Sequence, residues 1–347
     1  MTNARGHSRT RQLAAPMLAG IGIALTAGIL SAHDFWIVPD AFQVAAGGTL
    51  EVRGQTSTRF PTSLSAVTAE RVAEARLIGA ASDERLTELS TSGKSLLIRH
   101  RPATPGQRIV AVALVARSTR TTPERLKRYI ALEGAPALAE RYEREGTYPK
   151  TDSVTQISAK FAKTLVEVGQ GGSRAFARTV GHALELVPVN DPSALHVGDT
   201  LVVRLLYHGL PVAGAQLHAG AAPAGVTTKS DSAQVAAALP AKDISAETGL
   251  DGAARIVVSE SGLWNVRTVH AAPAPVTPGA AGGAWEALFA TLVFNVPAAS
   301  GASGSAGDSS DSILALLADD PVVLESVGME TRAEFRSHHL PADKSTR

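Results

Sequence analysis

Ten histidines are the side chains of this 347-residue sequence best suited to chemistry, because the chain contains no cysteine. Cysteine nucleophiles and thiolate metal sites are therefore excluded. His33 is distinctive because it follows a long apolar segment directly and precedes Asp34. If processing removes everything up to Ala32, His33 becomes the amino terminus. Its α-amine and imidazole Nδ1 then form a preorganised pair of nitrogen donors for Ni, Co or Cu.

Such a chelate needs further ligands, since two nitrogens from one residue leave the other coordination positions of the metal unfilled. Asp34 either adds an oxygen ligand or orients the ring of His33. The third nitrogen must come from elsewhere, because no two histidines stand at a recognised metal-ligand spacing. The candidates are His100, His182, His196, His208, His218 and His270. In the alternative interpretation, His33 is an ordinary residue that leads into the first strand.

The amino-terminal segment predicts export. Arg5, Arg9 and Arg11 precede the uncharged segment 13–32, which ends in small residues. A basic region, an apolar region and a small-residue boundary are typical of a secretory signal peptide, here residues 1–32. The mature protein would then be periplasmic. Cleavage after Gly28 and an uncleaved membrane anchor are the alternatives, and either would remove the free amine of His33.

The elements that would position these residues are mostly extended. Short alternating runs such as 49–54 and 107–118 predict half-buried strands between turns rich in proline and glycine. Residues 121–146 interrupt this pattern with a Thr-Pro start and apolar residues at helical spacing, which predicts a helical insertion. The first domain is therefore predicted as β-rich over residues 33–180.

Residues 181–297 show the clearest alternation, with short turns and no intervening helix. They predict a second antiparallel β-sandwich, of immunoglobulin or transthyretin type. The composition of residues 298–347 predicts a flexible linker and tail. The expected fold is thus mainly β: two antiparallel β-sandwich domains, with a short helical insertion in the first.

Several polar residues of the second domain lie where a ligand would be expected. His270 closes a predicted strand and would face a loop, and Glu286 follows Trp285 at the start of the last predicted strand. His208 and His218 lie on the two strands of a predicted hairpin and would face each other there. All four can also be read as ordinary polar residues of a sheet.

Other classes of site find no support. The net charge of +1, from 33 basic and 32 acidic residues, does not indicate nucleic-acid binding. The glycine-rich segment 169–173 lacks the lysine of a phosphate loop, and no nucleophile elbow or His-Glu-x-x-His helix is present. No carboxylate pair is marked for acid/base catalysis. We therefore do not expect an enzyme.

Several segments, taken in order, resemble a domain-of-unknown-function family of bacterial periplasmic proteins. Many of its members are regarded as accessory proteins of nickel/cobalt uptake. The similar segments are 32–36, 125–146, 159–169, 181–217, 251–272 and 285–296. The resemblance spans about residues 32–297 and implies a periplasmic protein with two β-rich domains. It also implies metal handling, with His33, His270 and Glu286 at the matching positions.

The leading hypothesis is a non-enzymatic periplasmic protein that binds Ni, Co or Cu for uptake or buffering. His33 would chelate the metal, His270 would supply the third nitrogen, and Asp34 and Glu286 would support them. An inner-membrane metal permease or an outer-membrane receptor would be the partner. The alternative is a metal-independent module that binds carbohydrate or protein. A copper oxidase is a third hypothesis, against which the 4% aromatic content argues.

Overall fold

The computed structural model describes residues 34–132, 135–230, 234, 243–275 and 283–298, all within one compact unit. The predicted signal peptide 1–32, His33 and the predicted tail from 299 onward lie outside the described residues. Within the described ranges, no helix is both long and apolar enough to cross a membrane. The description below therefore concerns the β-rich part of the chain.

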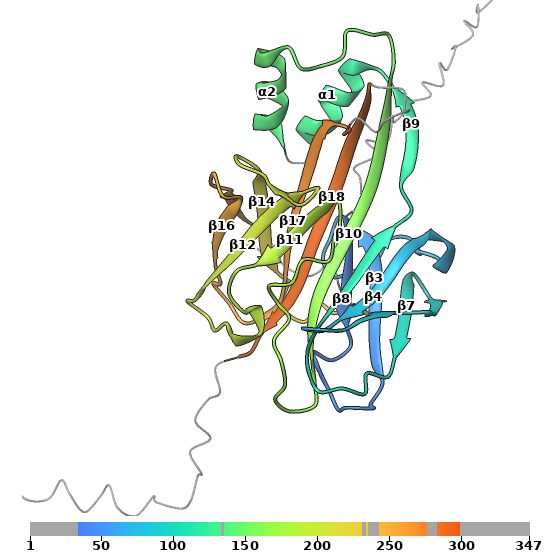
Figure 1. Cartoon of the computed structure of the whole chain (residues 1–347), viewed down its shortest axis with the longest axis vertical. Helices are drawn as coiled ribbons and strands as arrows, with labels where there is room; N and C mark the ends of the chain where they lie inside the picture. The colour runs from blue at the N-terminus through green and yellow to red at the C-terminus, as the bar shows by residue number, and fades with distance from the viewer. Residues whose placement is uncertain (1–33, 133–134, 231–233, 235–242, 276–282, 299–347) are drawn as a thin grey trace, which may run out of the picture. The chain divides into compact units, whose positions relative to one another are not determined.

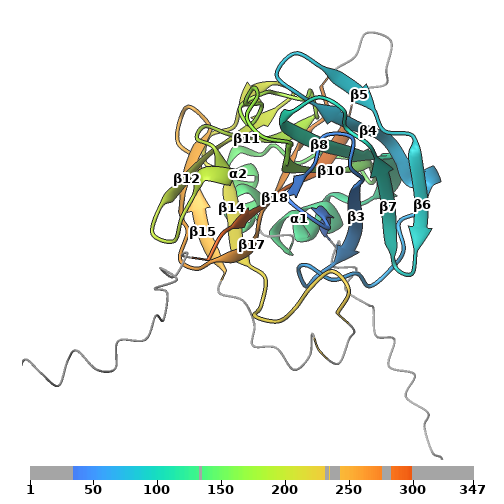
Figure 2. The same ribbon diagram turned by 90° about the horizontal axis from the view of Figure 1, so that it is seen from below.

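The described strands form three sheets (Figure 1, Figure 2). The N-terminal sheet has the order β1 (Asp34–Pro39), β3 (Leu50–Ser57), β7 (Ser95–His100), β6 (Glu88–Ser92). The C-terminal sheet has the order β11 (Leu184–Pro188), β12 (Thr200–Tyr207), β13 (Leu210–Pro211), and β16 (Ala253–Val257) also pairs with β12.

The central sheet lies between these two. Its order is β15 (Ile244–Glu247), β14 (Gln216–Ala221), β17 (Gly262–Pro273), β18 (Ala284–Val296), β10 (Val154–Val168), β8 (Gly106–Leu114), β4 (Val72–Ile78), β5 (Asp83–Arg85). β2 (Gln43–Val44) and β9 (Arg117–Thr121) also pair with β10. Two short 3₁₀ helices complete the strand connections: η1 (Ala69–Arg71) and η2 (Pro192–Ala194).

The long strands β10 and β18 join the two halves of the chain. They run parallel, and their register extends from Thr155 opposite Ala284 to Thr164 opposite Val293. The other strand pairs of the described residues are antiparallel, apart from the short pairing of β2 with β10. The mainly β, sandwich-like fold is therefore confirmed, and a single continuous sheet runs through both predicted domains.

The two faces of the central sheet carry different cores, because successive side chains of a strand point to opposite sides. On β18, Leu288, Ala290 and Leu292 pack with the C-terminal sheet, and we call this side the C-sheet face. Trp285 and Phe289 point to the other side, where the helices pack, and we call it the helix face. Farther along the same sheet, strands β4, β8 and β10 pack against the N-terminal sheet.

The predicted helical insertion is confirmed, and it consists of two helices rather than one. They are α1 (Pro123–Leu132) and α2 (Pro136–Glu145), and they lie at one end of β10, β17 and β18 (Figure 1). Pro136 lacks a backbone N–H and therefore suits the first turn of α2. Leu126, Ile130 and Tyr142 are buried against the helix face, and the Tyr142 hydroxyl donates to the Ala271 carbonyl at 2.7 Å.

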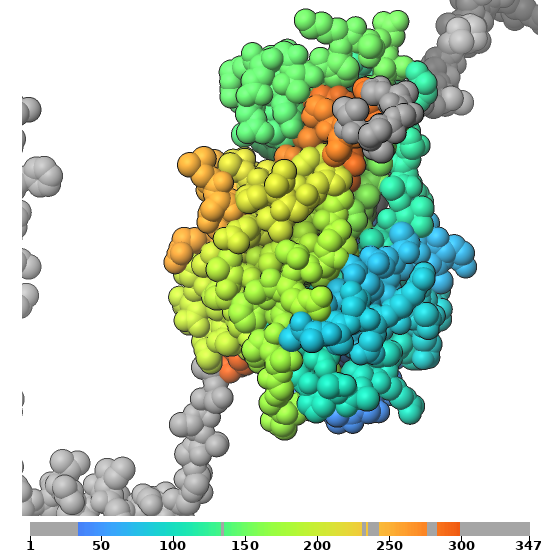
Figure 3. Space-filling view, viewed as in Figure 1, coloured from blue at the N-terminus to red at the C-terminus, as the bar shows by residue number. Residues whose placement is uncertain are grey.

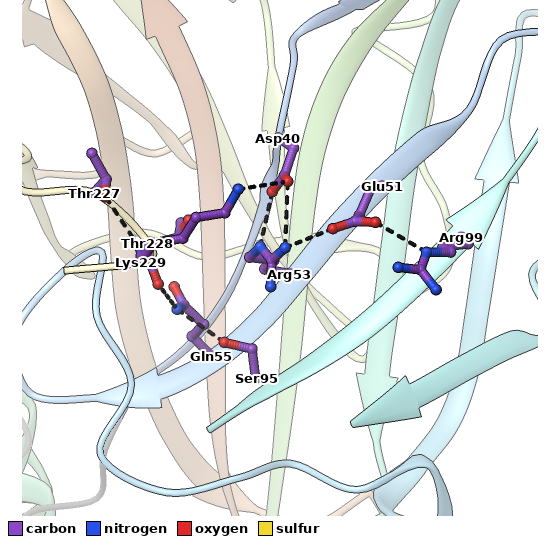
Figure 4. Close-up of polar contacts among 9 residues, drawn as sticks. All are labelled: Asp40, Glu51, Arg53, Gln55, Ser95, Arg99, Thr227, Thr228 and Lys229. Atoms are coloured by element: carbon purple, nitrogen blue, oxygen red, sulfur yellow. Dashed lines mark hydrogen bonds and ion pairs between the residues drawn. The ribbon is translucent and has the colours of Figure 1, made fainter. Parts of the chain in front are cut away.

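The segment after β14 contacts the N-terminal sheet (Figure 4). The Gln55 amide nitrogen donates to the Thr228 carbonyl at 2.8 Å, and Lys229 Nζ lies 3.3 Å from Asp40 Oδ2. Arg53 binds the same carboxylate from its other side, at 2.9 Å. Burial alone would raise the pKa of Asp40, but the hydrogen bonds and charges of Arg53 and Lys229 lower it. The two sandwiches, which lie side by side in Figure 3, are thus joined by polar contacts as well as by β10 and β18.

Two details of the second domain differ from the predictions. The strands after Thr200 do not form one long hairpin, because β13 has only two residues and β14 crosses to the central sheet. His208 and His218 therefore do not face each other. His270 does not close its strand either, since β17 continues to Pro273 by pairing with the start of β18. His270 is buried, at 7% exposure.

Candidate functional site

One polar cluster gathers on the helix face where β14, β15 and β17 lie side by side. We call it the His218 cluster, and its members are Asp34, His218, Asp243, Ser245 and Arg267. His218 stands directly opposite Arg267 on one neighbouring strand and opposite Ser245 on the other. Cross-strand neighbours of this kind bring their side chains together on the same face. The pairing of β14 with both strands therefore builds this cluster.

The contacts of the cluster orient the imidazole of His218. Its Nδ1 lies 3.2 Å from Asp243 Oδ2 and 3.2 Å from Ser245 Oγ. Asp243 Oδ2 also accepts from Arg267 Nη2 at 2.9 Å. Burial would raise the pKa of Asp243, but the hydrogen bond from His218 and the charge of Arg267 lower it, so this carboxylate is ionised at neutral pH.

An ionised carboxylate only accepts hydrogen bonds, so Nδ1 of His218 carries the proton that faces Asp243. In a neutral imidazole, Nε2 then holds the free lone pair. This Nε2 is buried and has no hydrogen-bond partner among the described residues. A buried polar atom without a partner is unusual in a folded protein and calls for a missing ligand or water.

Asp34 connects the cluster to the start of the described chain. Its Oδ2 lies 3.5 Å from Arg267 Nε, and it also interacts with the charges of Lys160 and His218. Burial raises the pKa of Asp34, although these positive charges act in the opposite direction. His33 lies outside the described residues, but the peptide bond holds its Cα about 3.8 Å from that of Asp34.

A second polar cluster lies on the opposite face of the sheet, and we call it the Glu286 cluster. Its members are Tyr207, His208, His270 and Glu286. Glu286 Oε2 accepts from the Tyr207 hydroxyl and from His208 Nε2, each at 2.8 Å. The ring of Tyr207 also packs against His270, with centroids 4.9 Å apart. Burial and the hydrogen bond to Glu286 raise the pKa of Tyr207, so its hydroxyl remains a donor.

A tight turn holds His208 in this cluster. His208 and Gly209 connect β12 and β13 with φ angles of 47° and 79°. Positive φ at both residues is what a two-residue hairpin turn of type I′ requires. Glycine adopts it readily, and histidine is one of the few other residues enriched in this region. The turn thereby aims the ring of His208 at Glu286.

His270 forms the buried side of the Glu286 cluster. Burial lowers the pKa of His270 to about 4, and the charge of Arg141 acts in the same direction. Its imidazole is therefore neutral at pH 7. It borders a cavity of about 20 Å³ that Leu138 and Arg141 also line. A space of this size holds about one water molecule.

The structure therefore separates the three predicted metal ligands that it describes, while His33 lies outside the described residues. His270 and Glu286 share the C-sheet face, whereas Asp34 lies with His218 on the helix face. In the part of the chain that the structure describes, no three histidine or acidic side chains are arranged to hold a metal ion by themselves. A metal at the His218 cluster would consequently need at least one ligand from outside the described residues.

The structure brings together residues that no sequence motif marked. His218 was one of six possible third nitrogens, and neither Asp243 nor Arg267 stood out in a motif. Their strands are far apart in sequence and meet only through the pairing of β14 with β15 and β17. The alternation in β14 does place His218 on the half-exposed side of its strand. That was the one available signal.

Comparison with known proteins identifies a family. A family model described as "Domain of unknown function (DUF4198)" matches residues 30–272. This match confirms the resemblance to a domain-of-unknown-function family, while the nickel/cobalt role stays a prediction. A comparison with curated proteins gave no match.

Two solved structures are similar over much of the chain, at low scores. Trypsin-activated alpha-2-macroglobulin from Escherichia coli shares 9% identity with a TM-score of 0.19, and the match covers 77% of this chain and 16% of that one. The full ectodomain of mouse nectin-like molecule 4 shares 11% identity with a TM-score of 0.15, over 76% of this chain and 63% of that one. This chain thus spans less than two thirds of either protein.

Proposed function

The chain belongs to the DUF4198 family of domains of unknown function, and we propose that it is a periplasmic protein that binds a divalent Ni, Co or Cu ion. The α-amine and imidazole of His33 form the chelate, and His218 supplies the third nitrogen. The protein acts as a non-enzymatic accessory in metal uptake or as a metal buffer. An inner-membrane permease or an outer-membrane receptor is its partner in uptake.

The observation that carries this proposal is the unpaired Nε2 of His218. Histidines that bind metals usually donate their other ring N–H to a carboxylate, which fixes the tautomer and the orientation of the ring. His218 makes this contact with Asp243 at 3.2 Å. The lone pair of Nε2 is therefore directed away from Asp243 and available to a ligand.

The position of Asp34 supports His218 over His270 as the third nitrogen. Asp34 shares the helix face and the guanidinium of Arg267 with the His218 cluster, and His33 is its covalent neighbour. His270 points to the C-sheet face, where it packs against Tyr207. Three nitrogen donors of this kind suit Cu(II), Ni(II) and Co(II).

The proposed ligands also predict how binding depends on pH. Metal binding releases protons, because the α-amine and the imidazoles must be deprotonated to act as ligands. We therefore expect affinity to rise between about pH 6 and pH 8, where both groups lose their protons.

The deciding experiment measures metal affinity for two forms of the mature chain. One form starts at His33, and the other carries one additional alanine before His33. The additional residue keeps the imidazole but displaces the α-amine, so it should weaken Ni(II) and Cu(II) binding by at least about 100-fold. The intact mass of protein exported by its native host shows which amino terminus is produced in the cell.

Variants of three histidines identify the third nitrogen. His218→Ala should lose affinity to a similar degree, whereas His270→Ala and His100→Ala should retain it. His100 is a suitable control because its ring is partly exposed and pairs with Glu84 instead. Equal affinity of all forms, or a mature chain that begins at another residue, would exclude the chelate. A metal-independent carbohydrate- or protein-binding module would then become the leading hypothesis.

A further inference from the structure

A cleft of about 510 Å³ opens beside β10, on the same side of the central sheet as the helices. One wall comes from the connection between β3 and β4, which includes η1. The opposite wall comes from β9 and the residues that precede it, and Tyr129 of α1 closes one end. The Val115 amide donates to the Arg71 carbonyl at 2.8 Å, so the backbone holds these two walls next to each other.

The charges of the cleft have one sign. Arg71, Arg117 and Lys160 line it, no aspartate or glutamate is among its described lining residues, and Asp34 interacts with the charge of Lys160 from outside the cleft. Such a concentration is unusual for a chain whose net charge is only +1. Positive charge lining a concave, low-dielectric surface focuses the electrostatic field and attracts anions.

The two arginines at the centre of this arrangement are not explained by structural pairing. Neither Arg71 nor Arg117 forms an ion pair with a carboxylate of the described residues, whereas Arg267 of the His218 cluster pairs with both Asp34 and Asp243. They repel each other: burial, followed by the charge of Arg117, lowers the pKa of Arg71. Arginine remains protonated at any physiological pH, so the repulsion persists until an anion offsets it.

The rest of the lining suits a small polar molecule. Hydroxyl and amide groups from Thr119, Thr121, Gln156 and Ser158 lie between the cations. Gln156, Ser158 and Lys160 occupy every second position of β10, so their side chains share one face of the sheet. Thr119 pairs directly with Gln156. These groups can bind the hydroxyl or ester oxygens of a ligand whose acidic groups the arginines hold.

We propose that this cleft is a binding site for a small organic polyanion that carries two or more carboxylate or phosphate groups. Arg71 and Arg117 bind one acidic group between them, and Lys160 binds another. Paired guanidiniums match the planar geometry of carboxylates and the oxygens of phosphates equally well. The site requires neither His33 nor a metal ion, so it goes beyond the proposed metal function.

Calorimetric titration of the metal-free protein with two probes tests this site. Tricarballylate supplies three carboxylates with little affinity for metals, and tripolyphosphate supplies phosphate groups. At least one probe should bind with a stoichiometry of one, and its affinity should fall as NaCl is added. Tighter binding of tricarballylate identifies a polycarboxylate as the ligand, and tighter binding of tripolyphosphate identifies a phosphate.

The matched variants are R71Q/R117Q, R117Q alone and R255Q. Loss of charge-assisted hydrogen bonds should weaken binding by about tenfold to a hundredfold in the double variant. R255Q should bind as the parent does, because Arg255 is an exposed residue of β16 on another sheet. The thermal midpoint of the double variant should equal or exceed that of the parent, since two repelling charges are removed.

Three results would overturn the proposal. The first is the absence of saturable binding of either probe, and the second is binding that R71Q/R117Q leaves unchanged. The third is binding restricted to long polyanions such as heparin. R117Q serves as the decisive variant if the double variant does not fold. His218→Ala separates this site from the metal site: it should lose metal binding but keep anion binding, and loss of both would contradict a separate cleft.

Discussion

The two polar clusters on opposite faces of β17 contain similar residue types but differ in how their hydrogen bonds are satisfied. In the Glu286 cluster, one carboxylate accepts from a tyrosine and a histidine, and a second histidine is packed neutral beside them. In the His218 cluster, the carboxylate binds one ring nitrogen and leaves the other without a partner among the described residues. The first arrangement is closed, and the second is open to a ligand.

This difference separates a cluster whose hydrogen bonds are made within the protein from one that leaves a buried ring nitrogen without a partner among the described residues. A buried polar group that is fully hydrogen-bonded stabilises one conformation, whereas an unpaired acceptor lowers stability unless a ligand completes it. We therefore expect substitutions in the Glu286 cluster to change stability, and substitutions in the His218 cluster to change metal binding.

The largest effect on stability should come from Glu286→Ala. It leaves the half-buried Tyr207 hydroxyl and the exposed His208 ring without their acceptor, which should cost about 1 to 3 kcal/mol. Urea unfolding measures this loss, and metal affinity should stay unchanged. Glu88→Ala is the control, because Glu88 is an exposed residue of β6. A loss of metal affinity in Glu286→Ala would return Glu286 to the ligand set.

Asp243→Asn should show the opposite pattern. The uncharged asparagine amide binds the Nδ1 proton of His218 more weakly and orients the ring less firmly. Metal affinity should therefore fall by about 10-fold to 100-fold. Stability without metal should change little, because this contact is partly exposed to solvent. Competitive titration against a metal-binding dye measures the affinity. Unchanged affinity would mean that Asp243 does not orient a ligand.

His182 provides a third kind of histidine for the comparison. It is 5% exposed, and neither ring nitrogen has a partner among the described residues. Burial lowers its pKa to about 3, and the charges of Lys163 and Arg76 act in the same direction. In the unfolded chain this imidazole takes up a proton near pH 6.5, whereas in the folded chain it stays neutral down to about pH 3. The free energy of unfolding therefore falls as the pH decreases from about 6.5 towards 3.

His182→Leu should therefore remove a pH dependence. Between pH 7 and pH 5 the free energy of unfolding of the parent should fall by about 2 kcal/mol more than that of the variant. Urea unfolding of both proteins at the two pH values measures this difference. Parallel losses in the two proteins would mean that His182 is protonated in the folded state and therefore has a hidden partner.

The smallest effect should come from the turn that presents His208. His208→Asn and His208→Ala both remove the hydrogen bond to Glu286, but asparagine tolerates the positive φ of 47° better than alanine. The alanine variant should be less stable by about 1 kcal/mol. Thermal unfolding compares the two variants directly, and equal midpoints would show that the turn relaxes when the ring is removed.

Much of the fold could be predicted from the sequence because its signals are local. Alternation marked the strands around Leu50, Val110 and Leu201, and helical spacing marked Leu126 and Ile130. The division into α1 and α2 is local as well, since Pro136 starts a new helix. The pairing of β10 with β18 was not predictable, because parallel register between distant strands leaves no periodic pattern in either one.

The candidate site was less predictable for the same reason. Position relative to the apolar segment drew attention to His33 and Asp34, and that signal is local. The partners of Asp34 depend on which strands become neighbours and on which face each side chain points. A one-residue shift in the pairing register reverses the face of every side chain, and β17 extends three residues beyond the predicted end at His270. His218 could be identified only once the strands were placed.

The pairing of β10 with β18 also constrains how the chain is made. Thr164 Oγ1 donates to the Val293 carbonyl across 129 residues of sequence. A ribosome or translocation channel that has released only the first 280 residues has therefore delivered a central sheet with an open edge along β10. Contacts this distant in sequence slow folding, and unpaired edges favour aggregation. Chaperones that shield β10 until β18 arrives should consequently raise the yield of this protein.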